Sequence, residues 1–295
     1  MNTTISIVVP TYKRKESLLR LMKSLAREKV KALEIVIVEQ VENNKNKYVE
    51  IAKKHALVLR YTFLFEPSTA KAMNVGASLT KGKYILFLDD DVEVRKGILE
   101  AHLDNFKDLG VAATVGRSIT RGQNVERNRK DTGRITWLGH FSDGFSSEIR
   151  QEVDTVIGCN TCWRKGVFTD MGGIDEQFTG NAIRLESDLS LRAINAGYKI
   201  IFEPGAVVDH YRAETGGARK TVGRLQWYFD FFSNEVYFFL KHRAQWLLPI
   251  FLLTKIEWAI RCMFGFGREV SIRSVSTPFM GVMDGIRKYR VYLHL

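Results

Sequence analysis

The fold is decided by Lys83-Tyr84-Ile85-Leu86-Phe87-Leu88-Asp89-Asp90-Asp91-Val92-Glu93. The apolar run from Tyr84 to Leu88 does not alternate, which is typical of a strand covered on both faces. Three aspartates cannot remain inside such a strand, because unpaired buried charges cost too much. They must emerge at its carboxyl end, where open α/β sheets bind ligands. Clustered oxygens there suit Mg²⁺ or Mn²⁺ and hence a diphosphate, although an acidic turn before a helix would give the same pattern.

The segments on either side of this stretch alternate between strand and helix patterns. Before it, we predict strands at 5–10, 34–39 and 57–65, and helices around 18–25 and at 48–55 and 70–79. After it, we predict helices at 97–106, 164–171 and 188–196, and strands at 111–115, 153–158 and 198–203, the last stopped by Pro204. This alternation predicts an α/β fold with a mostly parallel central sheet flanked by helices.

Two segments stand outside this alternation. Residues 117–134 are polar and carry no periodicity, which predicts a loop that is functional, mobile or simply solvated. The helical pattern of 227–240 has an aromatic face, and the uncharged run 244–254 is too short to span a bilayer. With basic flanks and three tryptophans, this region fits a helix in the membrane interface. It equally fits an apolar face packed on the catalytic domain or on a second subunit, as a homodimer through 225–260.

Composition and charge narrow the class of protein. The 295 residues are 45% hydrophobic and 26% charged, which is ordinary for a globular chain. The net charge is +11, and the stretch from Tyr211 to Leu295 has 13 Lys and Arg against 6 Asp and Glu. A basic tail suits an anionic lipid surface or a phosphorylated substrate. No nucleic-acid recognition motif accompanies it, so we expect no nucleic-acid partner.

The N-terminus and the cysteines bear on the compartment. The start of the chain lacks a basic segment followed by an apolar one, so no secretory signal is predicted. Three cysteines make no disulfide framework, and Cys159 and Cys162 lack the second ligand pair of a zinc site. We expect a cytoplasmic protein, with peripheral attachment to the cytoplasmic face of the membrane if the tail binds lipid.

Motifs spread over residues 5–211 resemble family 2 inverting glycosyltransferases, which have the GT-A fold. The donor-side motifs are Ile7-Val8-Val9-Pro10-Thr11-Tyr12, Ala72-Met73-Asn74-Val75-Gly76 and Leu86-Phe87-Leu88-Asp89-Asp90-Asp91. The acceptor-side motifs are Gly158-Cys159-Asn160, Arg164, Gly172-Gly173-Ile174-Asp175-Glu176 and Glu186-Ser187-Asp188-Leu189-Ser190-Leu191-Arg192. Each motif alone is weak, but their order and spacing together are specific.

The resemblance implies a site for a nucleotide-diphospho-sugar donor. The implied donor-binding residues are Pro10, Thr11, Tyr12, Glu39, Asn74, Asp89 and Asp90. Glu39 would read the base, although the family usually has Asp there. Asp91, with Asp89 and His210, would hold Mn²⁺ or Mg²⁺ on the diphosphate; a lone histidine can also be structural. Arg212, Arg219 and Lys220 would close over the diphosphate as a lid.

The resemblance also implies a carboxylate base on the acceptor side. Register favours Glu186, where the family usually has Asp, and Asp188 is its rival. A carboxylate in the first turn of a helix is also favoured by the helix dipole alone. The implied acceptor or sugar contacts are Asn160, Trp163, Trp137 and Asp175, although the tryptophans could equally pack in the core.

The sequence therefore predicts a catalytic domain over 1–212, with a nucleotide-binding half at 1–93 and an acceptor half at 94–212. Residues 213–295 form a basic, aromatic-rich helical extension. The predicted reaction is sugar transfer to a hydroxyl on a glycan or lipid-linked glycan.

Two other classes of protein share some of these sequence features. A sugar-1-phosphate nucleotidylyltransferase would need a Gly-rich basic loop after the first strand, and a non-catalytic glycan- or membrane-binding subunit would not need Asp89, Asp91 and Glu186.

Overall fold

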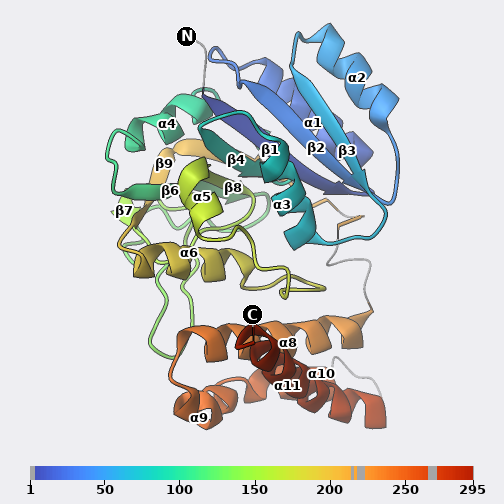
Figure 1. Cartoon of the computed structure of the whole chain (residues 1–295), viewed down its shortest axis with the longest axis vertical. Helices are drawn as coiled ribbons and strands as arrows, with labels where there is room; N and C mark the ends of the chain where they lie inside the picture. Colours follow the sequence, from blue (N-terminus) through green and yellow to red (C-terminus); the bar gives the residue numbers. More distant parts are fainter. Residues whose placement is uncertain (1–3, 214–215, 218–222, 265–270, 295) are drawn as a thin grey trace.

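The computed structural model describes residues 4–213, 216–217, 223–264 and 271–294. A nine-stranded sheet has helices on both faces, and a layer of C-terminal helices lies below it, next to α6 (Figure 1). The strands are β1 (Ile5–Tyr12), β2 (Glu34–Gln40), β3 (Leu59–Leu64), β4 (Tyr84–Leu88), β5 (Val92–Val94), β6 (Val111–Thr120), β7 (Gln151–Glu152), β8 (Asn160–Arg164) and β9 (Lys199–His210). The helices of the catalytic part are α1 (Lys15–Ala26), α2 (Lys45–Lys54), α3 (Thr69–Leu79), α4 (Ile98–Asn105), α5 (Lys165–Asp170) and α6 (Leu185–Asn195).

The sheet confirms the predicted α/β fold. Its strand order is β3-β2-β1-β4-β8-β6-β9-β5, with β7 on β9. The first four strands are parallel, as are β6 and β9, whereas β8 is antiparallel to both of its neighbours. Along β4, Ile85 and Phe87 enter one core cluster, and Tyr84, Leu86 and Leu88 enter the other. This is the two-sided burial that the unbroken apolar run predicted.

Three predictions about the strands are wrong. Pro204 does not stop the last strand, because the pairing of β6 with β9 shifts between Gly116 and Arg117, and Pro204 falls within that irregularity. A proline is tolerated where the ladder does not require its missing N–H. The strand expected at 153–158 is replaced by a turn between β7 and β8. Strand β6 runs on to Thr120, into the segment expected to be a loop.

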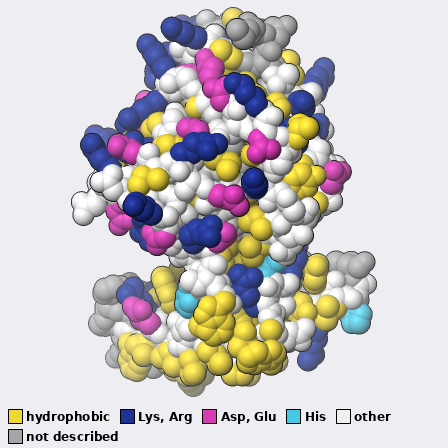
Figure 2. All heavy atoms as spheres, turned by 90° about the vertical axis from the view of Figure 1, so that its left-hand side faces the viewer, with side chains coloured by type: hydrophobic (Ala, Val, Ile, Leu, Met, Phe, Trp, Pro, Cys, Tyr) yellow, Lys and Arg dark blue, Asp and Glu magenta, His cyan; other side chains and the backbone are white. Residues whose placement is uncertain are grey.

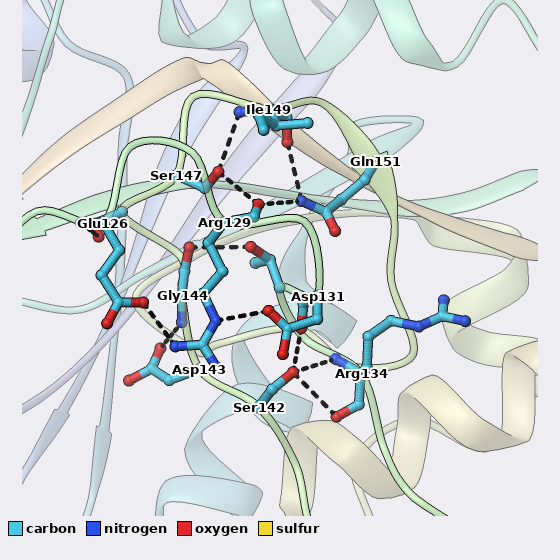
Figure 3. Close-up of polar contacts among 12 residues, drawn as sticks. Glu126, Arg129, Asp131, Arg134, Ser142, Asp143, Gly144, Ser147, Ile149 and Gln151 are labelled. Atoms are coloured by element: carbon cyan, nitrogen blue, oxygen red, sulfur yellow. Dashed lines mark hydrogen bonds and ion pairs between the residues drawn. The ribbon is translucent and has the colours of Figure 1, made fainter.

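The rest of the predicted loop 117–134 and the residues that follow it, up to residue 150, are joined by polar contacts (Figure 3). The Arg129 guanidinium bonds to Glu126 at 2.6 Å and to Asp131 at 3.0 Å. The Ser147 hydroxyl donates to the carbonyls of Arg127 and Arg129, at 3.1 and 2.9 Å. These contacts join residues 126–131 to the segment that follows the predicted loop.

The C-terminal extension consists of α8 (Arg224–His242), η1 (Gln245–Leu247), α9 (Leu248–Leu253), α10 (Ile256–Phe264) and α11 (Ile272–Tyr292). Every residue of α8 from Asp230 to Leu240 is buried, against α11 on one side and the catalytic part on the other. The aromatic face of α8 is therefore not available to a membrane or a second subunit. Within the described ranges, the chain has no helix both long enough and apolar enough to cross a membrane.

Candidate active site

The carboxyl ends of β1 and β4 lie side by side in the sheet and bring their loops together. The Thr11 hydroxyl, at the end of β1, donates to Asp90 Oδ2 at 2.7 Å. The Arg14 guanidinium, just beyond β1, lies 3.0 Å from Asp90 Oδ1 and 3.0 Å from Asp91 Oδ2. The triplet after β4 is thus organised by the loop that follows β1.

The end of strand β9 also lies at this edge of the sheet and contacts Asp91. Its last residue, His210, places Nε2 at 3.1 Å from Asp91 Oδ1, and the Ala213 N–H donates to Asp91 Oδ2 at 2.9 Å. Although burial acts to raise the pKa of Asp91, the His210 hydrogen bond and the Arg14 charge outweigh it and lower the pKa to about 2. Burial acts to lower the pKa of His210, but its bond to Asp91 prevails and raises it. Asp91 is therefore an anion at neutral pH.

Asp89, Asp91 and His210 fit a divalent cation. One ligand atom from each lies within 4.8 Å of the others. Two carboxylates and an imidazole are a donor set that suits Mn²⁺, and carboxylates also suit Mg²⁺. We refer to Asp89, Asp90 and Asp91 with their partners Arg14 and His210 as the aspartate cluster.

Asp90 has a different role from its two neighbours. It is 4% exposed, and its carboxylate faces Thr11 and Arg14. Burial raises its pKa to about 7, although the Arg14 charge opposes the rise. Asp90 therefore supports the loop expected to line the nucleotide and does not itself point to a donor.

Glu39 lies at the end of β2, as expected, but its acceptor positions are occupied by the protein. It is 2% exposed. Its four hydrogen bonds, of 2.7 to 2.8 Å, come from Asn44 N, Asn44 Nδ2, Tyr48 OH and Tyr61 OH. The structure thus makes Glu39 the organiser of the 41–44 turn, and does not support a direct role in reading a base. Long-range partners such as Tyr61 carry no local sequence signal.

Asn74 also differs from the expectation of a donor-binding residue. Its amide Nδ2 donates to the Ile174 carbonyl at 2.8 Å, and its Oδ1 accepts from the Ile174 N–H at 2.9 Å. Asn74 therefore joins α3 to the acceptor half. The Gly172-Gly173 turn, with both residues in the left-handed region, lies just before this contact.

Glu186 stands in the first turn of α6 and packs on the turn before β8. A Cβ on Gly158 would come within 2.5 Å of Glu186 Oε1, so the Glu186 carboxylate lies directly against the Gly158 backbone. Burial raises the pKa of the Cys159 thiol, and the charges of Asp89, Asp91 and Glu186 add to the effect. Leu88 pairs with Asn160, so Asp89, which follows β4, lies beside the Gly158-Cys159 turn on which Glu186 packs. The fold brings the predicted base and the aspartate cluster to one site.

Asp188, the rival base, is fully buried in ion pairs. Its Oδ1 lies 2.9 Å from Lys241 Nζ and 2.8 Å from His242 Nε2, and its Oδ2 lies 2.7 Å from Arg192 Nη2. Burial acts to raise the pKa of Asp188, but these partners lower it well below its usual range. Lys241 and His242 lie on α8, outside the expected site, so Asp188 joins α6 to α8 in this structure.

Near the predicted base, Glu186, lies a set of ion pairs that the sequence analysis did not predict. Arg184, with φ +77°, precedes α6 and binds Glu235 of α8 at 2.6 and 3.2 Å. Glu235 also binds Lys255 at 2.7 Å. Lys241 bridges Asp188 to Asp175, at 2.6 Å from the latter. We call Asp175, Arg184, Asp188, Arg192, Glu235, Lys241, His242 and Lys255 the helix clamp.

The helix expected at 188–196 begins earlier, because α6 starts at Leu185. The Ser187 hydroxyl, in its first turn, lies 2.8 Å from the Thr155 hydroxyl. The left-handed backbone at Arg184 is strained for a side chain other than glycine, and its bidentate pair with Glu235 holds it in place.

Several expected acceptor contacts are core residues. Asn160 is fully buried and bonds to His102 and the Ala206 carbonyl, at 3.0 and 2.9 Å. Trp163 is 1% exposed and packs on Phe168, so it has no face for a sugar. Trp137 is 63% exposed, on a loop whose Thr136 carbonyl accepts from Arg243 at the end of α8.

The remaining expected groups are the cysteines and the lid. Cys159 and Cys162 are free, buried thiols whose pKa burial raises, so they offer no thiolate. The segment after His210 returns to the nucleotide loop, because the Gly217 N–H donates to the Tyr12 carbonyl at 3.0 Å. Arg212 is exposed there. Arg219 and Lys220 lie outside the described residues.

Residues 6–172 match the family model described as "Glycosyl transferase family 2". The chain is 26% identical over 210 residues to the pre-mycofactocin glycosyltransferase of Mycobacterium tuberculosis, covering 70% of this chain and 42% of that protein. It is 24% identical over 225 residues to the glucosyl-dolichyl phosphate glucuronosyltransferase of Haloferax volcanii, covering 71% of each. The matched part thus spans less than half of the mycobacterial relative.

Solved structures with the same fold include two with bound nucleotide sugars. S. aureus TarS 1–349 in complex with UDP-GlcNAc has a TM-score of 0.66 at 17% identity, covering 98% of this chain and 82% of that one. The mannosyltransferase PcManGT of Pyrobaculum calidifontis, with GDP-Man and Mn²⁺, has a TM-score of 0.59 at 15% identity, covering 100% and 84%. At these identities the likeness is one of fold.

Proposed function

The chain belongs to glycosyl transferase family 2, and from that premise we propose a metal-dependent inverting enzyme. It transfers a sugar from a nucleotide-diphospho-sugar to a hydroxyl of a glycan or lipid-linked glycan. The observation that carries the proposal is that the candidate cation ligands Asp89 and Asp91 and a separate carboxylate, Glu186, lie near the Gly158-Cys159 turn. Mn²⁺ in the solved PcManGT and GalNAc-T7 structures supports the choice of a divalent cation.

In the proposed reaction Glu186 is the general base. It takes the proton of the acceptor hydroxyl while that oxygen attacks the anomeric carbon. The new C–O bond forms on one face of the sugar as the bond to the diphosphate breaks on the other, so the configuration inverts. Glu186 is suited to this role because it stands at the helix start and packs on a glycine backbone.

The leaving nucleoside diphosphate gains negative charge as its bond to the sugar breaks. Asp89, Asp91 and His210 would hold a cation that, when bound, offsets this charge. Thr11, Arg14 and Asp90 keep the adjoining loop in place. Arg212 belongs to the segment proposed as the diphosphate lid, with Arg219 and Lys220.

The test is a screen of nucleotide sugars for cation-dependent binding, followed by transfer assays of Glu186→Gln. We expect one nucleotide sugar to raise the melting temperature only with Mn²⁺ or Mg²⁺. Glu186→Gln should keep that binding and lose transfer by about a hundredfold or more, the usual contribution of a general base. Unchanged transfer by Glu186→Gln would refute its role. Release of pyrophosphate from a nucleoside triphosphate and a sugar phosphate would favour a nucleotidylyltransferase instead.

A further inference from the structure

The C-terminal helices expose large apolar side chains at the end of the molecule away from the sheet. Figure 2 shows hydrophobic side chains gathered along that end. Trp246, Leu253 and Phe279 are 75%, 65% and 67% exposed. Ile260 of α10 and Met283 of α11 are each 50% exposed. Contiguous apolar surface of this kind marks an interaction site more often than scattered exposed residues do. We call these exposed apolar residues of η1, α9, α10 and α11 the apolar end face.

Helix α11 turns its large apolar side chains away from its own protein. Ile272, Val275, Phe279 and Met283 follow the spacing of a single helical face, and all are exposed. The opposite face carries Gly281 and Gly285, packed so closely on α8 that added Cβ atoms would come within 2.7 and 2.6 Å of α8 carbonyls. The intramolecular packing therefore uses the small residues, and the apolar stripe is left for something outside the chain.

The charges on the extension indicate what that partner is. In the described parts of 223–294, the exposed Arg, Lys, Asp and Glu side chains are Arg224, Arg261, Arg273, Arg287, Arg290 and Glu257. Glu257 pairs with Arg261, and the half-buried Asp284 pairs with Arg287. Asp230 and Glu235 bond to internal partners. The exposed arginines of this part therefore outnumber its exposed carboxylates. Arg287 and Arg290 continue the exposed stripe of α11 beyond Met283.

We propose that the apolar end face docks on an anionic lipid bilayer. Its apolar side chains would enter below the headgroups while the arginines reach the lipid phosphates. A second copy is a poorer occupant, because a two-fold contact of this face with itself would set its arginines against one another. Helix α6, which carries Glu186, lies next to the extension together with the loop at Thr136 (Figure 1). Docking would therefore place the base side of the enzyme, not its nucleotide loops, nearest the bilayer.

The experiment is flotation of the full chain with phosphatidylcholine vesicles, with and without phosphatidylglycerol. We expect binding to the vesicles that contain phosphatidylglycerol and a fall of about tenfold or more for the double variant Leu253→Asp/Phe279→Asp. The matched control is Leu109→Asp, which replaces an equally exposed leucine in the loop before β6, at 77% exposure. The control should bind like the parent chain.

A second pair of variants tests the electrostatic part. Arg273→Gln/Arg290→Gln should weaken binding to anionic vesicles and make the remainder less sensitive to salt. Melting temperatures within a few degrees of the parent establish folding of each variant. No flotation with either lipid overturns the proposal, as does an equal loss in the Leu109 control. A parent dimer that Leu253→Asp/Phe279→Asp converts to a monomer, with no lipid dependence, assigns the face to a second copy. None of these outcomes depends on sugar transfer, so the proposed function stands or falls separately.

Discussion

The molecule contains two groups of buried acids that differ in their balance of charge. In the aspartate cluster, three consecutive carboxylates meet one guanidinium and one imidazole among the described residues. In the helix clamp, three carboxylates meet two arginines, two lysines and a histidine. Among the described residues, the carboxylates outnumber these cationic partners in the first group but not in the second.

The pKa values follow this difference. Burial acts to raise the pKa of Glu235, but Arg184 and Lys255 outweigh it and lower the pKa to about 2. Asp90 is just as buried, yet its pKa is raised to about 7 because Arg14 alone does not offset burial and the neighbouring Asp91. A charge-balanced cluster is satisfied by the protein and holds elements together. An acid-rich one gains most from an added cation, so we propose a catalytic role for the first cluster and a structural role for the second.

The largest effect is expected from Asp91→Asn. Removing this charge should lower transfer by about a thousandfold, as losses of preorganised electrostatic groups do. The fold should remain, because Asn has nearly the same shape and its one oxygen can still accept from the Ala213 N–H. Transfer kinetics with titrated Mn²⁺ measure the effect. Asp209→Asn, one residue before His210 in a half-exposed pair with Arg95, is the matched control and should change transfer little.

If Asp91→Asn kept full cation-dependent transfer, the aspartate cluster would not be the cation site, and the proposed difference between the two clusters would be wrong.

Asp188→Asn should act on stability. Breaking a buried ion pair costs about 3–5 kcal/mol, because its partners stay buried without their counter-charge. Urea unfolding measures this loss. The control is Glu257→Gln, which removes an exposed i,i+4 pair with Arg261 on α10 and should cost about 0.5 kcal/mol or less. A stable Asp188→Asn protein without transfer would instead make Asp188 the base.

The sequence predicts the two clusters unequally. Asp89, Asp91 and His210 were found because each follows a strand, and the carboxyl ends of strands in one sheet converge. The clamp partners Glu235 and Lys241 lie on α8, and Lys255 lies in the turn between α9 and α10. No local sequence pattern encodes where these elements are placed against the rest of the chain.

The same limit explains the residues that were misassigned. Trp163 and Asn160 belong to family-like motifs, but β8 runs between β4 and β6, where both its faces are covered. Glu39 has the expected place and different partners, because Tyr48 and Tyr61 reach it from α2 and β3. Position along a strand could be predicted from the sequence, whereas the exposure of a side chain depended on the neighbours of that strand.

The variant Glu235→Gln tests, through the pH dependence of stability, whether the charges of the helix clamp are balanced. The pKa of Glu235 falls from 4.5 to about 2 on folding, so its charge stabilises the fold above pH 4.5 by about 3 kcal/mol. That contribution is lost as the pH falls toward about 2. Glu235→Gln should therefore be less stable than the parent at neutral pH, and the difference should shrink in acid. Urea unfolding at a series of pH values measures it. A difference that does not change with pH would contradict the balanced-cluster interpretation.

The smallest effect is expected from Asp90→Asn. At neutral pH the Asp90 carboxyl carries only part of its charge, because its pKa is about 7. An Asn in its place still offers an oxygen to Thr11, so we expect kcat/KM to fall less than tenfold, about 1.4 kcal/mol. Asp90→Leu, which leaves the Thr11 hydroxyl and Arg14 without that acceptor, should be clearly worse. If Asp90→Asn proved as damaging as Asp91→Asn, the two aspartates would share the cation, and the division of roles within the cluster would be wrong.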